Sequence, residues 1–154
     1  MNRAIKFRGK RLDNEDWVHG DLLQIAGGCV IYHGSHTDST LIENTPNLDV
    51  ELAVELYMDE VSPVYPETVG QFTGMYDRKG KEIYEGDILG AKGYAIGWVK
   101  GGVRGYCYDV VYVNHPTMES DWSLYSTVKD DYPEQIEVIG NIYDNPELLK
   151  GGEK

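Results

Sequence analysis

The sequence has only two cysteines, no long apolar run and few basic residues, and each scarcity excludes a class of protein. Cys29 and Cys107 are isolated and form no CxxC pair, so we expect no disulfide framework and a reducing cytoplasmic environment. No run of about 18 apolar residues occurs, and no charged-then-apolar leader precedes the first elements. We therefore expect neither a membrane-spanning nor an exported protein.

The shortage of positive charge argues against binding to nucleic acid or to an anionic membrane. The chain has 14 Lys and Arg against 26 Asp and Glu, which gives a net charge of −12, whereas phosphates require basic side chains. The basic residues gather at the start of the chain, and residues 12–77 hold thirteen acids with no Lys or Arg. The basic start comprises Arg3, Lys6, Arg8, Lys10 and Arg11.

Two interpretations of this charge pattern stand side by side. A basic first strand can lie against an acidic sheet face, so that the chain neutralises part of its own charge. Alternatively, the acidic stretch forms a face that meets a basic partner.

The residues that are abundant favour strands and turns. The 154 residues include 18 glycines, 12 tyrosines and 3 tryptophans, and 41% are hydrophobic, a composition typical of β structure with its own apolar core. We predict an all-β, mostly antiparallel and barrel-like fold with a short C-terminal helix.

Two short motifs occur twice in the same order. Gly20-Asp21-Leu22-Leu23 returns as Gly86-Asp87-Ile88-Leu89, and the segment 67–72 returns as 137–142. This spacing predicts one β-rich unit used twice, about 1–77 and 78–150, within a single domain of 1–154.

The paired motifs are interpreted as structural rather than chemical. Glycine adopts backbone conformations closed to other residues, and an aspartate carboxylate accepts hydrogen bonds from nearby backbone N–H groups. No base, nucleophile or metal partner stands at a recognisable spacing from Asp21 or Asp87. The predicted structural positions are Gly20, Asp21, Gly70, Gln71, Gly74, Gly86, Asp87, Gly140 and Asn141.

Three segments carry specific secondary-structure predictions. Leu48–Leu56 has apolar residues at every second position, which predicts a strand, although its composition suits a helix. His115–Pro133 is predicted as a polar loop. Asn145-Pro146-Glu147 has the order of a helix start, so Asn145–Lys150 is predicted as one or two helical turns.

Longer motifs resemble the YopX family of small proteins from phages and prophages of low-GC Gram-positive bacteria. The similarity covers Pro66–Gly74, the turn Asp77–Lys81, Glu82–Ile88, Ile5–Lys10 and Val138–Leu149. The resemblance implies an all-β, barrel-like fold and a phage origin. It implies no activity, since the family supplies no catalytic or binding residues to transfer to this chain.

Candidate reactive residues are sparse. His33 and His36 with Asp38 form a weak candidate metal site, because a third close His or Cys is missing. Cys107 lies between two tyrosines in a predicted strand and is interpreted as a buried thiol. No GxGxxG or P-loop motif occurs. We expect no metal, nucleotide or organic cofactor.

The sequence favours a non-enzymatic interaction or assembly module that forms a homo-oligomer, with a host or phage protein as a further partner. An acidic decoy that binds a basic host protein surface is the alternative. A small-molecule hydrolase is a more distant third hypothesis.

Overall fold

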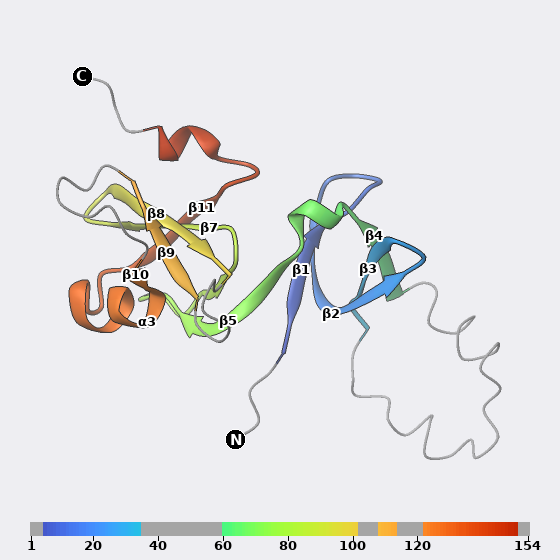
Figure 1. Ribbon diagram of the computed structural model, residues 1–154, viewed down its shortest axis with the longest axis horizontal. Coiled ribbons are helices and arrows are strands. Elements are labelled where there is room, and N and C mark those ends of the chain that lie inside the picture. The colour runs from blue at the N-terminus through green and yellow to red at the C-terminus, as the bar shows by residue number, and fades with distance from the viewer. Residues whose placement is uncertain (1–4, 35–59, 102–107, 114–121, 151–154) are drawn as a thin grey trace, which may run out of the picture. The chain divides into compact units, whose positions relative to one another are not determined.

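The computed structural model describes residues 5–34, 60–101, 108–113 and 122–150 (Figure 1). The chain divides into two compact units, an N-terminal unit of Lys6–Val69 and a C-terminal unit that runs from Gly70 and also includes Ile5. Strands dominate both units, and the helical pieces are short, so the all-β prediction is confirmed.

The N-terminal unit is an antiparallel meander in the order β4-β3-β2-β1. Its end curls back toward its beginning: Val64 forms a bridge with Arg11, and the Tyr65 N–H donates to the Lys10 carbonyl at 2.9 Å. The described strands thus form a curled sheet rather than a closed barrel. The elements are β1 (Phe7–Lys10), β2 (Trp17–Ile25), β3 (Gly28–Tyr32), β4 (Val61–Val64) and the 3-10 helix η3 (Pro66–Thr68).

Close backbone packing shapes the small core of this unit. Ile31 and Val64 are 0% and 1% exposed. A Cβ atom placed on Gly9 would lie 2.9 Å from the Val64 side chain. Glycine therefore lets β1 approach β4 where the sheet curls.

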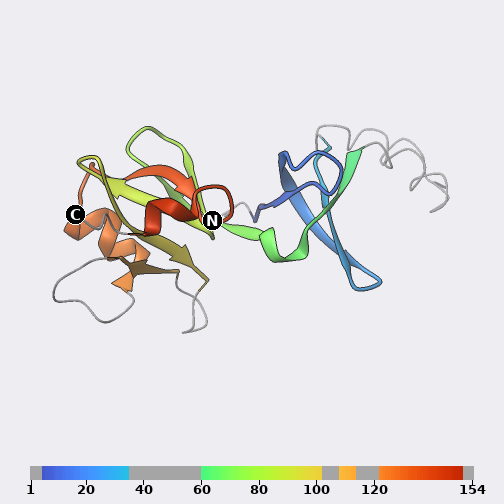
Figure 2. The ribbon, with the colours of Figure 1, turned by 90° about the horizontal axis from the view of Figure 1, so that it is seen from above.

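The C-terminal unit contains a β5–β6 hairpin and a five-stranded antiparallel sheet in the order β10-β9-β8-β7-β11 (Figures 1 and 2). Its strands are β5 (Gly70–Tyr76), β6 (Glu82–Tyr84), β7 (Asp87–Ala91), β8 (Tyr94–Lys100), β9 (Asp109–Tyr112), β10 (Trp122–Ser123) and β11 (Glu137–Asn141). Every residue of β7 is buried, since this strand lies between β8 and β11.

The core of the C-terminal unit joins the sheet to a helical segment that the sequence analysis missed. Leu89, Val99 and Val110 from the sheet pack in one cluster with Leu124, Val128 and Ile136. Leu124 starts α3 (Leu124–Ser126), and Val128 lies in the π-helical η4 (Thr127–Asp131).

The prediction of a polar loop over His115–Pro133 is therefore wrong for residues 122–131. Leu124 and Val128 are four residues apart, so one helical face brings both into the core. Hydrogen bonds support this placement, because Thr127 Oγ1 bonds both the Ser123 carbonyl and the Tyr112 hydroxyl, at 3.1 and 2.9 Å.

The predicted C-terminal helix is confirmed as the 3-10 helix η5 (Pro146–Leu149). Asn145 precedes it, but the Asn145 side chain accepts from the Asn141 N–H at 3.3 Å instead of capping the helix. The predicted strand Leu48–Leu56 lies outside the described residues.

Candidate functional site

The two Gly-Asp pairs have different local environments. Gly20 and Asp21 lie inside β2, where a Cβ on Gly20 would overlap the Tyr32 carbonyl oxygen. Gly86 has φ of 82° in the turn before β7, and Asp87 accepts a 2.8 Å hydrogen bond from the Tyr84 N–H. Glycine is thus required by close packing at position 20 and by backbone conformation at position 86.

The second pair of motif segments also has structural contacts. The Gln71 N–H donates to Glu85 Oε2 at 2.8 Å, and a Cβ on Gly70 would lie 2.6 Å from the Glu85 carbonyl oxygen. Gly140 packs against the Asn145 side chain. Asn141 Oδ1 accepts from the N–H groups of residues 143 and 144.

Gly74 marks an irregularity in β5. It has φ of 80° and lies where the pairing of β5 with β6 changes register between Phe72 and Tyr76. Its positive φ fits a bulge in a strand that bends toward the following turn.

Asp77 accepts three backbone hydrogen bonds in the C-terminal unit. One carboxylate oxygen accepts from the Lys79 and Lys81 N–H groups at 2.8 and 2.9 Å. The other accepts from the Val138 N–H of β11 at 3.1 Å. The Arg78 N–H donates to the Ile136 carbonyl at 2.9 Å. This turn therefore covers part of the outer edge of β11.

The hydrogen bonds to Asp77 also determine its ionisation. Burial raises the pKa of Asp77, but the N–H groups of Lys81, Val138 and Lys79 outweigh burial and lower the pKa below 3.8. The carboxylate is consequently charged near neutral pH and holds the turn against β11.

An ion cluster extends this contact. Arg78 and Lys79 both pair with Glu137, and the Lys79 Nζ atom lies 2.8 Å from the carboxylate. Hydrogen bonds from Lys79 and then Arg78 lower the pKa of Glu137 below its ordinary value of 4.5.

Of the weak metal candidate, the structure describes only His33. His33 Nε2 lies 2.9 Å from Ser62 Oγ, and His36 and Asp38 lie outside the described ranges. Across the part of the chain that the structure describes, no three His, Cys, Asp or Glu side chains are grouped to hold a metal ion.

The basic start is paired in part with neighbouring acids. Arg11 bonds Asp13 at 2.6 Å, and Lys10 lies 4.0 Å from Glu15. Arg8 is only 7% exposed, and its guanidinium carbon lies 4.7 Å from the centroid of the Trp17 ring. The first residues therefore combine local charge pairing with packing on an aromatic ring.

An apolar face covers β2, β3 and β4 on the side away from Ile31. Side chains that pair across antiparallel strands share a face, and the register places Leu23 beside Val30 and Val30 beside Pro63. Leu23 is 43% exposed and Ile25, two residues along the same strand, is 61% exposed. We call Leu23, Ile25, Val30 and Pro63 the apolar face.

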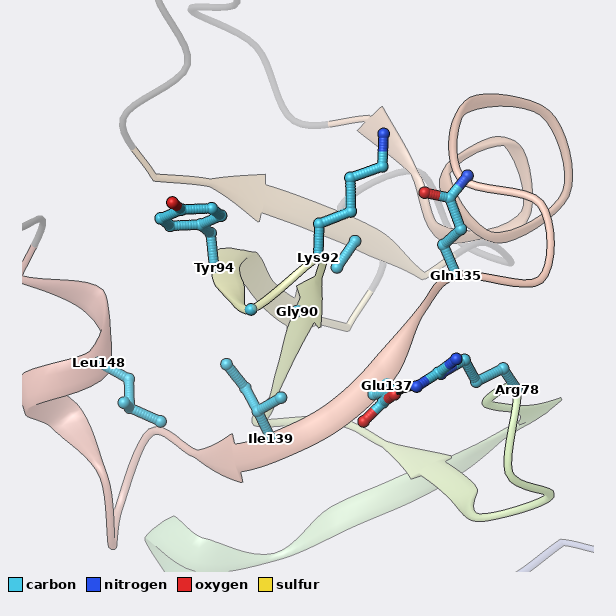
Figure 3. A pocket seen from close by; sticks show the side chains of 10 residues that line it. Arg78, Gly90, Lys92, Tyr94, Gln135, Glu137, Ile139 and Leu148 are labelled. Atoms are coloured by element: carbon cyan, nitrogen blue, oxygen red, sulfur yellow. Dashed lines mark hydrogen bonds and ion pairs between the residues drawn. The ribbon is translucent and has the colours of Figure 1, made fainter.

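A pocket of about 410 Å³ lies beside the β7–β8 turn of the C-terminal unit. In Figure 3, Lys92 and Gln135 lie on one side of it, Ile139 and Leu148 on the other, and the Arg78–Glu137 pair lies toward the β5–β6 turn. Sequence reasoning missed this pocket, because its lining comes from four separate segments. Within the sequence, the only local indication of the pocket was the pair of glycines near the β7–β8 turn, Gly90 and Gly93.

Comparison with known families decides the relationship that these motifs indicated. The family model described as YopX protein matches residues 6–150. The chain belongs to the YopX family. No curated protein matches it.

YopX membership covers both units, since the match runs from β1 to the end of η5. Among the described residues, no helix has the length and apolarity needed to cross a membrane.

Proposed function

We propose that this YopX-family protein is a non-enzymatic interaction module, of phage or prophage origin, that assembles as a homo-oligomer through the apolar face of its N-terminal unit. The observation that carries the proposal is the exposure of Leu23 and Ile25, 43% and 61%, on one side of β2. Exposed apolar patches on soluble proteins commonly mark interaction surfaces.

The local sequence supports this role for the apolar face. Residues 22–34 contain no Asp, Glu, Lys or Arg, although 26% of the chain is charged. Two copies that each carry a charge of −12 repel one another. A contact between copies is therefore least opposed along residues 22–34, where Asp21 is the neighbouring acid on the same face of β2.

The outer edges of β4 and β11 are covered, which favours face pairing over pairing at these two edges. β4 bonds back to the end of β1, where the Leu12 N–H donates to the Pro63 carbonyl at 3.0 Å. The Asp77 turn covers part of the β11 edge. Covered edges do not readily recruit a strand from another molecule, whereas two apolar sheet faces can pack together.

Light scattering with matched variants tests the proposal. The wild-type protein should have a mass that is a multiple of 17.4 kDa at micromolar concentration. Replacing Leu23 and Ile25 together by lysine should give the monomer, because charges would be desolvated at the contact. Tyr125→Lys is the control, since Tyr125 is 63% exposed and belongs to the C-terminal unit.

Three results would contradict the proposal. These are a monomeric wild type, a double variant that retains the oligomer, and a Tyr125→Lys variant that dissociates to the same extent. Far-UV circular dichroism of each variant confirms that the fold is retained before the masses are compared.

A further inference from the structure

We propose that the pocket beside the β7–β8 turn binds a small organic anion with an apolar body, of the aromatic carboxylate class. This inference is independent of the homo-oligomer, because the pocket belongs to the C-terminal unit and the apolar face to the N-terminal unit. A volume of about 410 Å³ lies within the usual range for small-molecule sites.

The charges at the pocket favour an anion. Arg78 and Lys79 both bind Glu137, so this carboxylate is already neutralised. Lys92 also lines the pocket, and no ion pair joins it to another described residue. Among the residues that line the pocket, two cations, Arg78 and Lys92, therefore accompany one carboxylate, Glu137, in a protein whose net charge is −12.

The remaining walls provide an apolar surface. Ile139 lies at a bulge of β11 and is 41% exposed, and Tyr94 is 78% exposed. A Cβ on Gly90 would lie 2.9 Å from Ile139 Cγ2, so glycine gives this side chain its position. Leu148 of η5 completes the wall (Figure 3). A flat ring can bury its faces against these side chains.

Gln135 supplies a second indication of a polar ligand. Its Oε1 atom is buried and has no hydrogen-bond donor among the described residues, an arrangement that costs free energy. Gln135 lines the pocket (Figure 3), so an N–H or O–H group of a bound ligand could donate to this oxygen.

The β7–β8 turn positions the charge of Lys92. Lys92 and Gly93 have φ of 53° and 85°, the conformation of a two-residue hairpin turn that favours Asn-Gly. Lysine is thus a costly choice for this turn, and Lys92→Asn removes the charge while improving the local conformation. The variant is expected to fold at least as well as the wild type.

Indole-3-acetate is the probe, since it combines a carboxylate, an aromatic ring and an N–H donor. Titration into the ¹⁵N-labelled full-length protein should shift the amide signals of Gly90, Gly93 and Ile139. The expected Kd is on the order of 1 mM, from the usual free energy per atom of a small ligand. Tryptamine, which replaces the carboxylate by an ammonium group, should bind at least about tenfold more weakly.

Variants separate the proposed contacts. Lys92→Asn should weaken indole-3-acetate binding about tenfold, as expected for loss of a charge-assisted contact, while the control Lys129→Asn leaves it unchanged. Gln135→Leu should weaken binding without lowering the thermal stability of the free protein, since it deletes an unsatisfied acceptor.

Four results would overturn the proposal. One is the absence of shifts at these amides with 10 mM indole-3-acetate, about ten times the expected Kd. The others are equal affinity for tryptamine, unchanged affinity in Lys92→Asn, and equal weakening by Lys129→Asn. The mass measurement for the homo-oligomer is unaffected by any of these results.

Discussion

At the scale of single residues, the buried carboxylate of Asp77 accepts a backbone hydrogen bond at the edge of β11, as the carbonyl of a neighbouring strand would. Asp77 is 7% exposed and accepts three backbone N–H groups, one of which belongs to β11. Sequence reasoning placed a turn at Asp77–Lys81 but could not connect it to Val138, which is 61 residues away.

Replacing Asp77 by alanine should lower the free energy of unfolding by about 3 kcal/mol, because three N–H groups lose a charged acceptor. Urea unfolding followed by tryptophan fluorescence measures this change. Asp13→Ala is the control, since that aspartate is in an exposed turn. A loss for Asp77→Ala that is no larger than for Asp13→Ala would contradict the assigned role.

The pH dependence of stability should also report on Asp77. Its pKa is lowered from 3.8 on folding, so its contribution is complete above the unfolded value and is lost as the pH falls through the folded value. Between pH 6 and pH 3, wild-type unfolding free energy should fall more steeply than that of Asp77→Asn. Parallel curves would show that the Asp77 carboxylate adds nothing to stability.

At the scale of elements, the glycines of β2 and the following turn serve different physical needs. Gly20 lies where a Cβ would overlap the Tyr32 carbonyl of β3, whereas Gly27 has φ of 84° with open space around it. Both glycines are visible in the sequence. Only the pairing of β2 with β3 shows that Gly20 is required by close packing, whereas Gly27 is required by its backbone conformation.

Gly20→Ala should therefore destabilise the protein more than Gly27→Ala. We expect about 3 kcal/mol at position 20, where strands must separate, and about 1 kcal/mol at position 27, where alanine takes a positive φ. Thermal unfolding of both variants under identical conditions measures the difference. Equal losses would mean that β3 moves aside at little cost.

The internal duplication remains a prediction. The compact units divide between Val69 and Gly70, earlier than the expected division at 77/78. The Gly-Asp pair is inside a strand in one unit and at a turn in the other. Superposition of the units, with Gly20 on Gly86 and Gly70 on Gly140, is the measurement that bears on common origin.

At the scale of the whole molecule, the net charge of −12 opposes the association that we propose for the apolar face. Salt should therefore strengthen the homo-oligomer, because it screens repulsion between copies while leaving apolar contact intact. Sedimentation at 0.05 M and 0.5 M NaCl should show a larger oligomer fraction at the higher concentration. A decrease with salt would indicate that ion pairs hold the copies together.

The sequence by itself determined the class of fold and the position of the C-terminal 3-10 helix. The abundance of tyrosine and glycine predicted strands, and Asn145-Pro146 predicted the start of η5, since these are preferences of single residues and their neighbours. Its motifs also identified the YopX family. In contrast, the local sequence did not predict the helical segment that contains Leu124 and Val128. Its residues are mostly polar, and it is stabilised by the packing of these two side chains in the core.

Only the tertiary structure decided which residues meet across long distances in the chain. The Asp77 turn and β11, the apolar face on three strands, and the pocket between the β7–β8 turn and η5 all depend on strand register. Register places side chains from separate segments on one surface, and composition or local periodicity does not specify that pairing.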